Sequence, residues 1–556
     1  MGLSDVLGRF ASTLRGGNAG SIGDGDELLV IGIDFGTTSS GVGWATTADI
    51  ANDQINVMTS WPGSGREEGK APTELFYEHG KMTWGFEVGN DCDPVRWFKL
   101  LLLKEEDLDP SLRSSEFVLR GRQHMRDEGK TAVELVADYL RALWCHILKS
   151  IAKARGEVVV DVSRFHVVIT VPAIWRPYAR QTMRDAAEKA GILKKRMIAG
   201  DTCLSFVAEP EAAALSTLSE SGRNPQEDDV YLICDGGGGT VDLITYKILE
   251  TGPLGLEEAV EGSGAWEYGP KYQFSLSHDM DYVISIPSAA FAKEKHVQAI
   301  FDEVMADIDV LVDGQIADAK AKNLHVTGII LVGGLGSSPY LYEHLRDRQR
   351  QSKINVLQSG GERPRVAICR GAVLSGFLKE QENKTLPGEE SVAPVKVVST
   401  IARASYGVIH YAPWDSTQHN KEDQFWHEKE QAWFARDRLR WYLKKGSNVT
   451  AAQPVSHRFY TLLDPLHAGN FDLKFFQCGE ASPPTAVNSS VTPLCTISCK
   501  SAIPFSDIPD FINGKGQKFK KLWYDVDMLP SGACVEFSVW SGWKKLGSSE
   551  VQIRFD

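Results

Sequence analysis

Apolar residues along the chain follow two different spacings. Continuous apolar runs at residues 27–45, 165–173, 231–248 and 326–334 each lead into Gly, Pro or Asp. Short apolar runs that end in turn-forming residues are typical of buried β-strands. The sequence therefore predicts strands in these segments, with a Gly-rich turn inside the first and third of them.

Between these strands, apolar residues recur every three or four positions, as on one face of a helix. Residues 131–151 carry this pattern, and so do residues 297–320. Residues 177–190 open with Pro177, which suits the first turn of a helix, and stop before Gly191. Strands that alternate with helices predict an α/β fold.

The character of the chain changes after Leu378. Residues 381–394 are polar and charged and contain proline, which predicts a linker. Residues 395–556 contain short strand-like runs separated by turns and hold many of the 14 tryptophans, so we expect a separate β-rich module there. Within it, the charged stretch 419–440 is predicted to be a helical or irregular insert. Residues 1–27 are rich in Gly, Ser and Asp and are predicted to form a disordered tail.

Composition narrows the classes of function. The 556 residues carry a net charge of −13, which disfavours nucleic-acid binding and attraction to anionic membranes. We find no apolar stretch long enough to span a membrane and no pattern of a signal peptide. The nine cysteines are scattered without a CxxC pair, so they predict reduced thiols and a cytoplasmic protein, with the nucleus as the other possible compartment.

The chemistry is concentrated in two similar motifs. IDFGTTSSGV at 33–42 and CDGGGGTVDL at 234–243 each read as strand, Asp, Gly-rich turn with Thr, and strand. Glycines let backbone N–H groups face a phosphate, threonine hydroxyls add donors, and an aspartate can hold a hydrated Mg²⁺. Either turn alone could simply close a hairpin. Two of them, far apart in the chain, predict related lobes that clamp a polyphosphate from opposite sides.

These motifs and four others resemble the superfamily of actin, hexokinase and seventy-kilodalton heat-shock protein ATPases, and most closely a divergent heat-shock-type member. The other four are VVITVPAIWRPYARQTMRDAAEKAGI, FVAEPEAAAL, GIILVGGLGSSPYL and ICRGAVLSGFL, and the set occurs in family order over residues 28–380. The resemblance implies a two-lobed actin-like ATPase domain at 28–380, followed by the β-rich module, with ATP or ADP and Mg²⁺ as cofactors.

The resemblance also implies which residues form the nucleotide site. The first phosphate loop would contain Asp34, Gly36, Thr37 and Thr38, and the second Asp235, Gly237, Gly238, Gly239 and Thr240. Asp34, Glu209, Asp235 and Asp242 would orient the waters around Mg²⁺, with Asp34 and Asp235 holding the ion largely through waters. Catalysis would fall to Lys99, Glu209, Asp235 and Thr240, and the adenosine would contact Gly333, Gly334, Ser337 and Lys271.

Three of these residues also have ordinary structural interpretations. Lys99 could be a surface lysine beside an apolar run, Glu209 could cap the helix that follows it, and Asp242 could lie on an exposed strand face. Asp34 and Asp235 follow buried strands, where a lone carboxylate is costly unless it meets a cation or donors. Their positions therefore favour a functional role.

The chain departs from the family in the second lobe and at its C-terminal end. Few residues separate Gly264 from Gly333, so the helices that sandwich the adenine ring are predicted to be shortened near 264–275. Tyr272 and Ser337 stand where the chaperones place arginines. Residues 395–556 are too short for both a peptide-binding β-sandwich and a helical lid.

From these observations we expect a chaperone-like ATPase that hydrolyses ATP slowly and closes its lobes around the nucleotide. One alternative is a pseudo-ATPase or regulatory scaffold that binds nucleotide without significant turnover. A second is a small-molecule kinase of the same superfamily. We expect the β-rich module to contact client or partner proteins or to support the lobes, and neither nucleic acid nor a membrane to be a partner.

Overall fold

The computed structural model divides the chain into two compact units, Met1–Val397 and Val398–Asp556. It describes residues 28–89, 91–108, 110–173, 175, 177–220, 223–238, 240–251, 254–265, 294–382, 395–450, 454–464, 470–501, 503–531, 534–542 and 544–551. The predicted tail at 1–27 lies outside these residues, and so do residues 383–394 of the predicted linker. Residues 381 and 382 continue a helix. Among the helices described, none combines the length and apolarity that a membrane span needs.

The first sheet of unit 1 combines an antiparallel hairpin with parallel strands. Its order is β3 (Asn56–Val57), β2 (Ser39–Thr46), β1 (Leu28–Phe35), β7 (Arg164–Val171) and β8 (Cys203–Ala208), and β4 (Ala71–Pro72) pairs with β2. Every residue of β1 is buried, because helices cover both faces of the sheet. The sheet is therefore apolar on both sides, as its continuous apolar runs predict.

One face of this sheet is covered by α5 (Ala132–Arg155) and α7 (Pro177–Ala190), which share a hydrophobic core with alternate residues of β1. Helix α5 begins with a capping box, in which Thr131 accepts from the backbone of Glu134 and the Glu134 side chain accepts from Thr131. This part of unit 1 also contains smaller elements, which are α2 (Thr47–Ala51), β5 (Leu75–Glu78), β6 (Lys81–Trp84), α3 (Pro110–Arg113), α4 (Glu116–Asp127) and α6 (Glu157–Val162).

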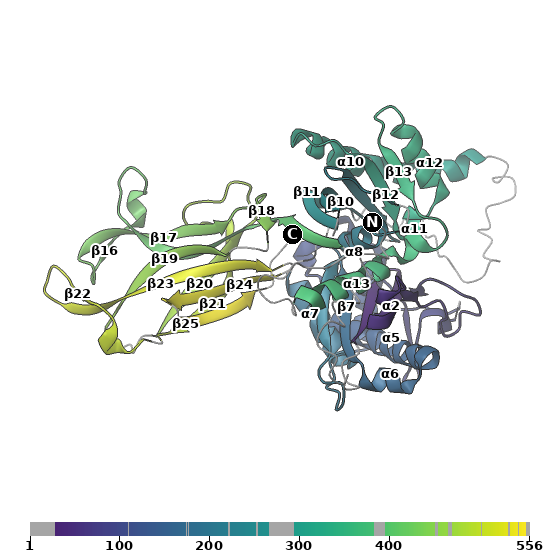
Figure 1. Ribbon diagram of the computed structural model, residues 1–556, viewed down its shortest axis with the longest axis horizontal. Helices are drawn as coiled ribbons and strands as arrows, with labels where there is room; N and C mark the ends of the chain where they lie inside the picture. The colour runs from purple at the N-terminus through teal and green to yellow at the C-terminus, as the bar shows by residue number, and fades with distance from the viewer. Residues whose placement is uncertain are drawn as a thin grey trace. The chain divides into compact units, whose positions relative to one another are not determined.

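Two helices, α8 (Glu209–Leu218) and α13 (Arg363–Glu382), pack on the opposite face (Figure 1). Glycines permit their close contacts. A Cβ on Gly371 would lie 1.7 Å from the carbonyl oxygen of Ala212, and one on Gly32 would lie 2.5 Å from that of Cys369. The small residues of the EPEAAAL and ICRGAVLSGFL motifs therefore allow two helices and a strand to meet almost backbone to backbone.

The second sheet of unit 1 packs on the other side of α8 and α13. Its strands follow the order β13 (Asn355–Gln358), β12 (Gly328–Val332), β9 (Val230–Gly236), β10 (Val241–Thr251) and β11 (Leu254–Ala265). Both sheets contribute to one core with α8 and α13, and α10 (Glu294–Ala321) and α12 (Pro339–Arg348) cover the far face of the second sheet. Residues 266–293, where the shortened insert is predicted, lie outside the described residues.

The strands and helices predicted from periodicity are present. The runs at 165–173, 231–248 and 326–334 form β7, β9 with β10, and β12, while the helical patterns form α5, α7 and α10. The molecule is thus a mixed α/β protein with several sheets.

The described part of unit 2 consists of strands and short 3₁₀ turns. One antiparallel sheet has the order β16 (Gln424–His427), β17 (Ala432–Leu443), β15 (Ser405–Pro413), β20 (Asn470–Cys478) and β21 (Val491–Lys500). Another has the order β19 (Val455–Leu463), β23 (Lys518–Ser531), β24 (Cys534–Ser541) and β25 (Lys544–Val551), with β22 (Asp510–Ile512) paired to β23. Strand β14 (Val395–Ile401) begins in unit 1 and continues into unit 2, where Ser399–Ile401 pair with β18 (Asn448–Thr450).

Aromatic residues hold the two antiparallel sheets of unit 2 together. The rings of Phe475 on β20 and Phe537 on β24 lie 4.2 Å apart, within a core to which both sheets contribute. The prediction of a helical or irregular insert at residues 419–440 is wrong. After a 3₁₀ turn at Lys421–Asp423, β16 and β17 form a hairpin whose second strand also pairs with β15. Strands β15 and β16 satisfy the backbone hydrogen bonds of β17, so the charged side chains of this stretch can lie on the exposed face of a strand.

Candidate functional site

The two Asp–Gly–Thr motifs form equivalent hairpins, one in each sheet of unit 1. In the first hairpin Asp34 on β1 pairs with Gly41 on β2, and in the second Asp235 on β9 pairs with Asp242 on β10. The turns are tight. A Cβ on Gly36 would lie 2.3 Å from the carbonyl oxygen of Ser39, and the Gly237 N–H donates to the Thr240 carbonyl oxygen at 2.9 Å.

The turns of the two hairpins touch each other. A Cβ on Gly238 would lie 2.2 Å from Thr38 Oγ1, so the backbone of the second turn rests against the threonine side chain of the first. Thr37 and Thr38 are both partly exposed. The fold therefore brings together the two turns that the sequence predicts to be phosphate loops, and Gly238 lies against Thr38 where they meet.

The predicted carboxylates lie below these turns and are almost completely buried. The exposed fractions are 2% for Asp34, 7% for Glu209, 4% for Asp235 and 3% for Asp242. Asp235 Oδ1 and Asp242 Oδ2 have no hydrogen-bond partner among the described residues. A buried carboxylate oxygen without a partner is costly. The cluster therefore has unsatisfied capacity to accept bonds from a cation or its water ligands.

Two lysines enter the cluster from the first sheet's side. Lys99 Nζ lies 2.7 Å from Glu209 Oε1, and Lys70 Nζ lies 2.6 Å from Asp34 Oδ2. Lys99 is 1% exposed, so its interpretation as a surface lysine is wrong. Glu209 makes no capping hydrogen bond to α8, and Asp242 is buried, so the structural alternatives for these two residues are also wrong.

The electrostatics of the site follow from burial and crowding. Burial raises the pKa of Asp235 well above its ordinary value, and the neighbouring Glu209 and Asp242 add to the effect. Burial and Glu209 raise the pKa of Asp242 to about 7. Burial also raises the pKa of Glu209, against the opposing charge of Lys99. Four carboxylates face two ammonium groups, so full ionisation leaves an excess of negative charge that suits a divalent cation.

Lys70 is a residue that the motifs do not reveal. It precedes β4, whose pairing with Ser39 and Ser40 on β2 places it beside the first turn. Burial opposes its charge, but Asp34 outweighs burial and raises the pKa of the Lys70 ammonium. Thr170 on β7 also donates to Asp34 Oδ1, at 3.3 Å. The strand pairing that brings Lys70 to Asp34 leaves no local signal in the sequence.

The predicted adenosine residues are only partly placed. Gly333 has a φ of +87°, and a Cβ there would lie 2.4 Å from Asp235 Oδ1. This glycine therefore packs directly against the aspartate of the second hairpin. Gly333, Gly334 and Ser337 belong to the short turn around α11 (Gly333–Gly336), where the Ser337 hydroxyl donates to the Gly334 carbonyl oxygen at 2.6 Å. Gly239 and Lys271 lie outside the described residues.

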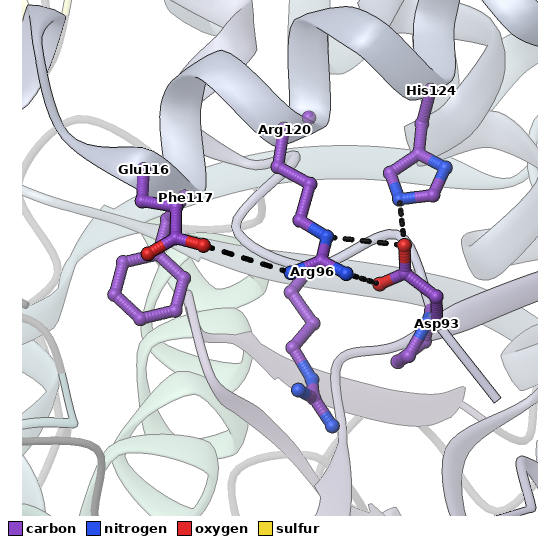
Figure 2. A pocket seen from close by; sticks show the side chains of 8 residues that line it. Asp93, Arg96, Glu116, Phe117, Arg120 and His124 are labelled. Atoms are coloured by element: carbon purple, nitrogen blue, oxygen red, sulfur yellow. Dashed lines mark hydrogen bonds and ion pairs between the residues drawn. The ribbon is translucent and has the colours of Figure 1, made fainter. Parts of the chain in front are cut away.

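A small cavity lies elsewhere in unit 1, beside α4 (Figure 2). Its volume is about 30 Å³, and Asp93, Pro94, Arg96, Glu116, Phe117, Arg120, Gly121 and His124 line it. The Arg120 guanidinium lies 2.8 Å from Asp93 and 3.8 Å from Glu116. The charged residues that line the cavity therefore neutralise one another. This space suits a water molecule, and none of the predicted nucleotide residues lines it.

Comparison with known proteins finds one family model and several relatives. A family model described as a domain of unknown function (DUF8568) matches residues 400–497, within unit 2. Heat shock 70 kDa protein 12A of Mus musculus is 27% identical over 308 residues, which cover 44% of this chain and 44% of that protein. The chaperone protein HscA homolog of Rickettsia bellii is 26% identical over 411 residues, 68% of this chain and 61% of that protein.

A third relative extends the same pattern. The chaperone protein DnaK of Thermoplasma acidophilum is 26% identical over 408 residues, 64% of this chain and 59% of that protein. The alignments thus cover less than two thirds of each of these relatives. All three are members of the seventy-kilodalton heat-shock family, and the resemblance drawn from the six motifs is confirmed. With its paired Asp–Gly–Thr hairpins and its low identity to these relatives, the chain is a divergent Hsp70-like protein.

Proposed function

We propose that unit 1 binds ATP or ADP together with Mg²⁺ at its two hairpins and hydrolyses ATP slowly. In this proposal the two sheets, with α8 and α13 between them, are the two lobes of an actin-like ATPase domain. The observation that carries it is the buried cluster of Asp34, Glu209, Asp235 and Asp242 directly below two touching phosphate-type turns. Unpartnered oxygens on Asp235 and Asp242 give the cluster a need for a cation.

Each group has a role in this proposal. The N–H groups of the glycine turns bind phosphate oxygens, and the Lys99 ammonium stabilises negative charge that develops on the transferred phosphoryl group. Glu209, held by Lys99, orients the attacking water. Asp34 and Asp235 are the residues that would hold Mg²⁺, largely through waters, and the ion would supply positive charge against the phosphates.

The contact between the turns gives the proposal a conformational element. A polyphosphate that binds both turns spans the point where Gly238 of one hairpin meets Thr38 of the other. Once bound, it contacts both hairpins and so favours one relative position of the two sheets over others. We propose that nucleotide binding closes the two sheets around the nucleotide and that its release lets them open.

A specific observation favours a second candidate, nucleotide binding without turnover. Both lysines of the cluster are engaged, Lys70 with Asp34 and Lys99 with Glu209. A lysine held by a carboxylate must exchange that partner for phosphate oxygens before it can assist hydrolysis. A scaffold that only binds nucleotide would not need this exchange.

For unit 2 we propose a role in contacting client or partner proteins. Trp426 and Trp433 face each other across the β16–β17 hairpin, with ring centroids 5.3 Å apart, and they are 38% and 51% exposed. Exposed aromatic residues are enriched at protein interfaces, where they supply contact area at little entropic cost.

Titration calorimetry with MgADP, combined with phosphate release from MgATP, tests the nucleotide proposal. We expect binding and slow hydrolysis in the wild type and loss of both in Asp235→Asn. The matched control is Asp201→Asn, because the Asp201 side chain is 78% exposed and lies outside the cluster. Binding with equal phosphate release from wild type and Asp235→Asn would support the scaffold. Absence of binding in the folded wild type would overturn both candidates.

A further inference from the structure

A second cluster of reactive side chains lies on the first sheet, away from the two hairpins. It contains His166 on β7, Cys203 on β8 and Glu380 on α13, whose nitrogen, sulfur and oxygen atoms all lie within 4.8 Å of one another. His166 and Cys203 are direct neighbours across the parallel β7–β8 pair. His166 is fully buried and Glu380 is 7% exposed, while Cys203 is partly exposed. The thiol therefore combines a buried base with access from solvent.

Hydrogen bonds fix the orientation of the imidazole. His166 Nδ1 lies 2.8 Å from Glu380 Oε1, and Nε2 lies 2.8 Å from Ser205 Oγ. A carboxylate only accepts hydrogen bonds, so Nδ1 carries a proton and Nε2 is the basic nitrogen on the side of β8. Arg164 Nη1 donates to Glu380 at 3.0 Å and holds the carboxylate in place. A thiol beside a base that a third group orients is the arrangement of an activated nucleophile.

We propose that Cys203 is a reactive thiol that forms mixed disulfides with small-molecule disulfides, with His166 as its base and Glu380 as a positioning residue. Transfer of the thiol proton to the His166 imidazole gives a Cys203 thiolate and a His166 imidazolium. The thiolate attacks one sulfur of the disulfide, so that a new S–S bond forms as the old one breaks. The leaving thiolate takes the proton from His166, and the products are the Cys203 adduct and one free thiol.

The local charges favour this chemistry over a bound metal ion. Arg164 and Glu380 neutralise each other, and proton transfer from Cys203 to His166 adds one charge of each sign. The cluster is thus electrically balanced before and after the transfer and has no excess negative charge for a cation to compensate. Hydrogen bonding to His166 lowers the pKa of the Cys203 thiol, in agreement with this arrangement.

Modification at this position would act on the end of α13. Glu380 lies in the last part of this helix, next to Lys379, whose Nζ donates to the Phe206 carbonyl oxygen of β8 at 2.6 Å. An adduct on Cys203 would compete for the space between β8 and Glu380. The contacts that hold the last turns of α13 to the sheet would therefore sense the redox state of the thiol.

Reaction of the reduced full-length protein with oxidised glutathione, followed by peptide mass spectrometry, tests the proposal with an internal control. Cys145 is exposed, whereas Cys203 is only partly exposed, so exposure alone predicts that Cys145 reacts first. We expect Cys203 to form its adduct on the order of tenfold faster at neutral pH. Equal rates, or a faster reaction at Cys145, would overturn the proposal.

Two further measurements separate the proposed chemistry from a structural role. The His166→Gln variant should slow the adduct at Cys203 by roughly tenfold and leave the rate at Cys145 unchanged. His166 is fully buried, so its replacement could disturb the fold. Iodoacetamide labelling of the wild type over a range of pH tests the proposal without a variant.

In that pH series the labelling midpoint of Cys203 should lie below that of Cys145. The groups that face His166 and Cys203 are Arg164 from β7, Ser205 from β8 and Glu380 from α13. They are the same at every pH point, because all samples are wild-type protein. Coinciding midpoints would count against the proposal. So would stoichiometric zinc in the purified protein together with labelling of Cys203 only after chelation.

Discussion

Lys99 Nζ and Glu209 Oε1 lie 2.7 Å apart in the interior of unit 1, although 110 positions separate these residues in the chain. Lys99 immediately precedes a short 3₁₀ turn at Leu100–Leu102, and Glu209 is the first residue of α8. The rings of Phe35 and Trp175 lie 5.8 Å and 5.4 Å from the ammonium. A lysine in such surroundings depends on its carboxylate partner.

Replacing Lys99 by methionine should therefore lower both stability and activity. The Lys99→Met variant leaves Glu209 buried without its cation, so we expect the free energy of unfolding to fall by about 3–5 kcal/mol. Adding Glu209→Gln removes the unpaired charge and should restore most of the loss, but not ATP hydrolysis. Urea unfolding and phosphate release measure the two effects. Recovery of hydrolysis in the double variant would contradict the role assigned to Lys99.

Asp242 should make the stability of the folded protein depend on pH. Burial and Glu209 raise its pKa from 3.8 to about 7, so the folded protein binds this proton more tightly than the unfolded chain. The contribution of this group to stability therefore declines as pH rises from about 4 to about 7 and is constant above that.

An Asp242→Asn variant should accordingly be more stable than the wild type at pH 8 without nucleotide, by about 1–3 kcal/mol. It should also lose most of the stabilisation that MgADP gives to the wild type. Thermal unfolding with and without MgADP measures both effects, and Asp201→Asn serves as the exposed control. Unchanged stabilisation by MgADP would show that Asp242 has no part in the site.

The adjacent glycines Gly333 and Gly334 should respond very differently to substitution by alanine. Gly333 has a left-handed φ of +87°, and a Cβ would lie 2.4 Å from Asp235 Oδ1. Gly334 has no atom within 4 Å of the corresponding position. Gly333→Ala should destabilise the fold by about 2–4 kcal/mol and weaken nucleotide binding, whereas Gly334→Ala should change stability by less than about 0.5 kcal/mol.

Denaturant unfolding and calorimetry of these two variants provide the comparison. Equal stability of Gly333→Ala and Gly334→Ala would mean that the close approach to Asp235 is not required in solution.

Glu380 should contribute to stability above mildly acidic pH. Burial opposes its ionisation, but hydrogen bonds from His166 and Arg164 outweigh burial and lower its pKa from 4.5 to about 2. Its stabilising contribution is therefore complete above the unfolded pKa and is lost as pH falls from about 4.5 towards 2.

A Glu380→Gln variant should be less stable than the wild type near pH 6, by about 2–4 kcal/mol, and the difference should shrink on acidification through this range. Urea unfolding at several pH values gives the difference directly. A gap that does not change between about pH 6 and pH 3 would show that the carboxylate charge is not what holds the end of α13.

Much of the fold could be predicted because its signals are local. The apolar runs that lead into Asp, Gly or Pro predict β1, β7, β9 and β12, and the repeat of three or four residues predicts α5, α7 and α10. The pairing of β1 with β2 and of β9 with β10 follows from the turn residues between adjacent strands. The motifs also identify Asp34, Asp235 and the glycines, since a phosphate loop needs these residue types in consecutive order.

The tertiary structure decided which distant residues meet. Lys70 reaches Asp34 because β4 pairs with β2, and Cys203 reaches His166 and Glu380 because β8 lies beside β7 under the end of α13. The charged stretch at 419–440 contains a hairpin because its second strand, β17, pairs with β15.

The physical reason is the difference between local and long-range interactions. The spacing of side chains along the sequence determines helices, strands and turns, because those interactions span only a few residues. Burial, ion pairing and the pKa of a buried carboxylate depend on neighbours that the packed chain supplies from far away. For this protein the sequence therefore determined the two hairpins and the residue types in their turns, and the packing of the two sheets around α8 and α13 decided the charges that surround them.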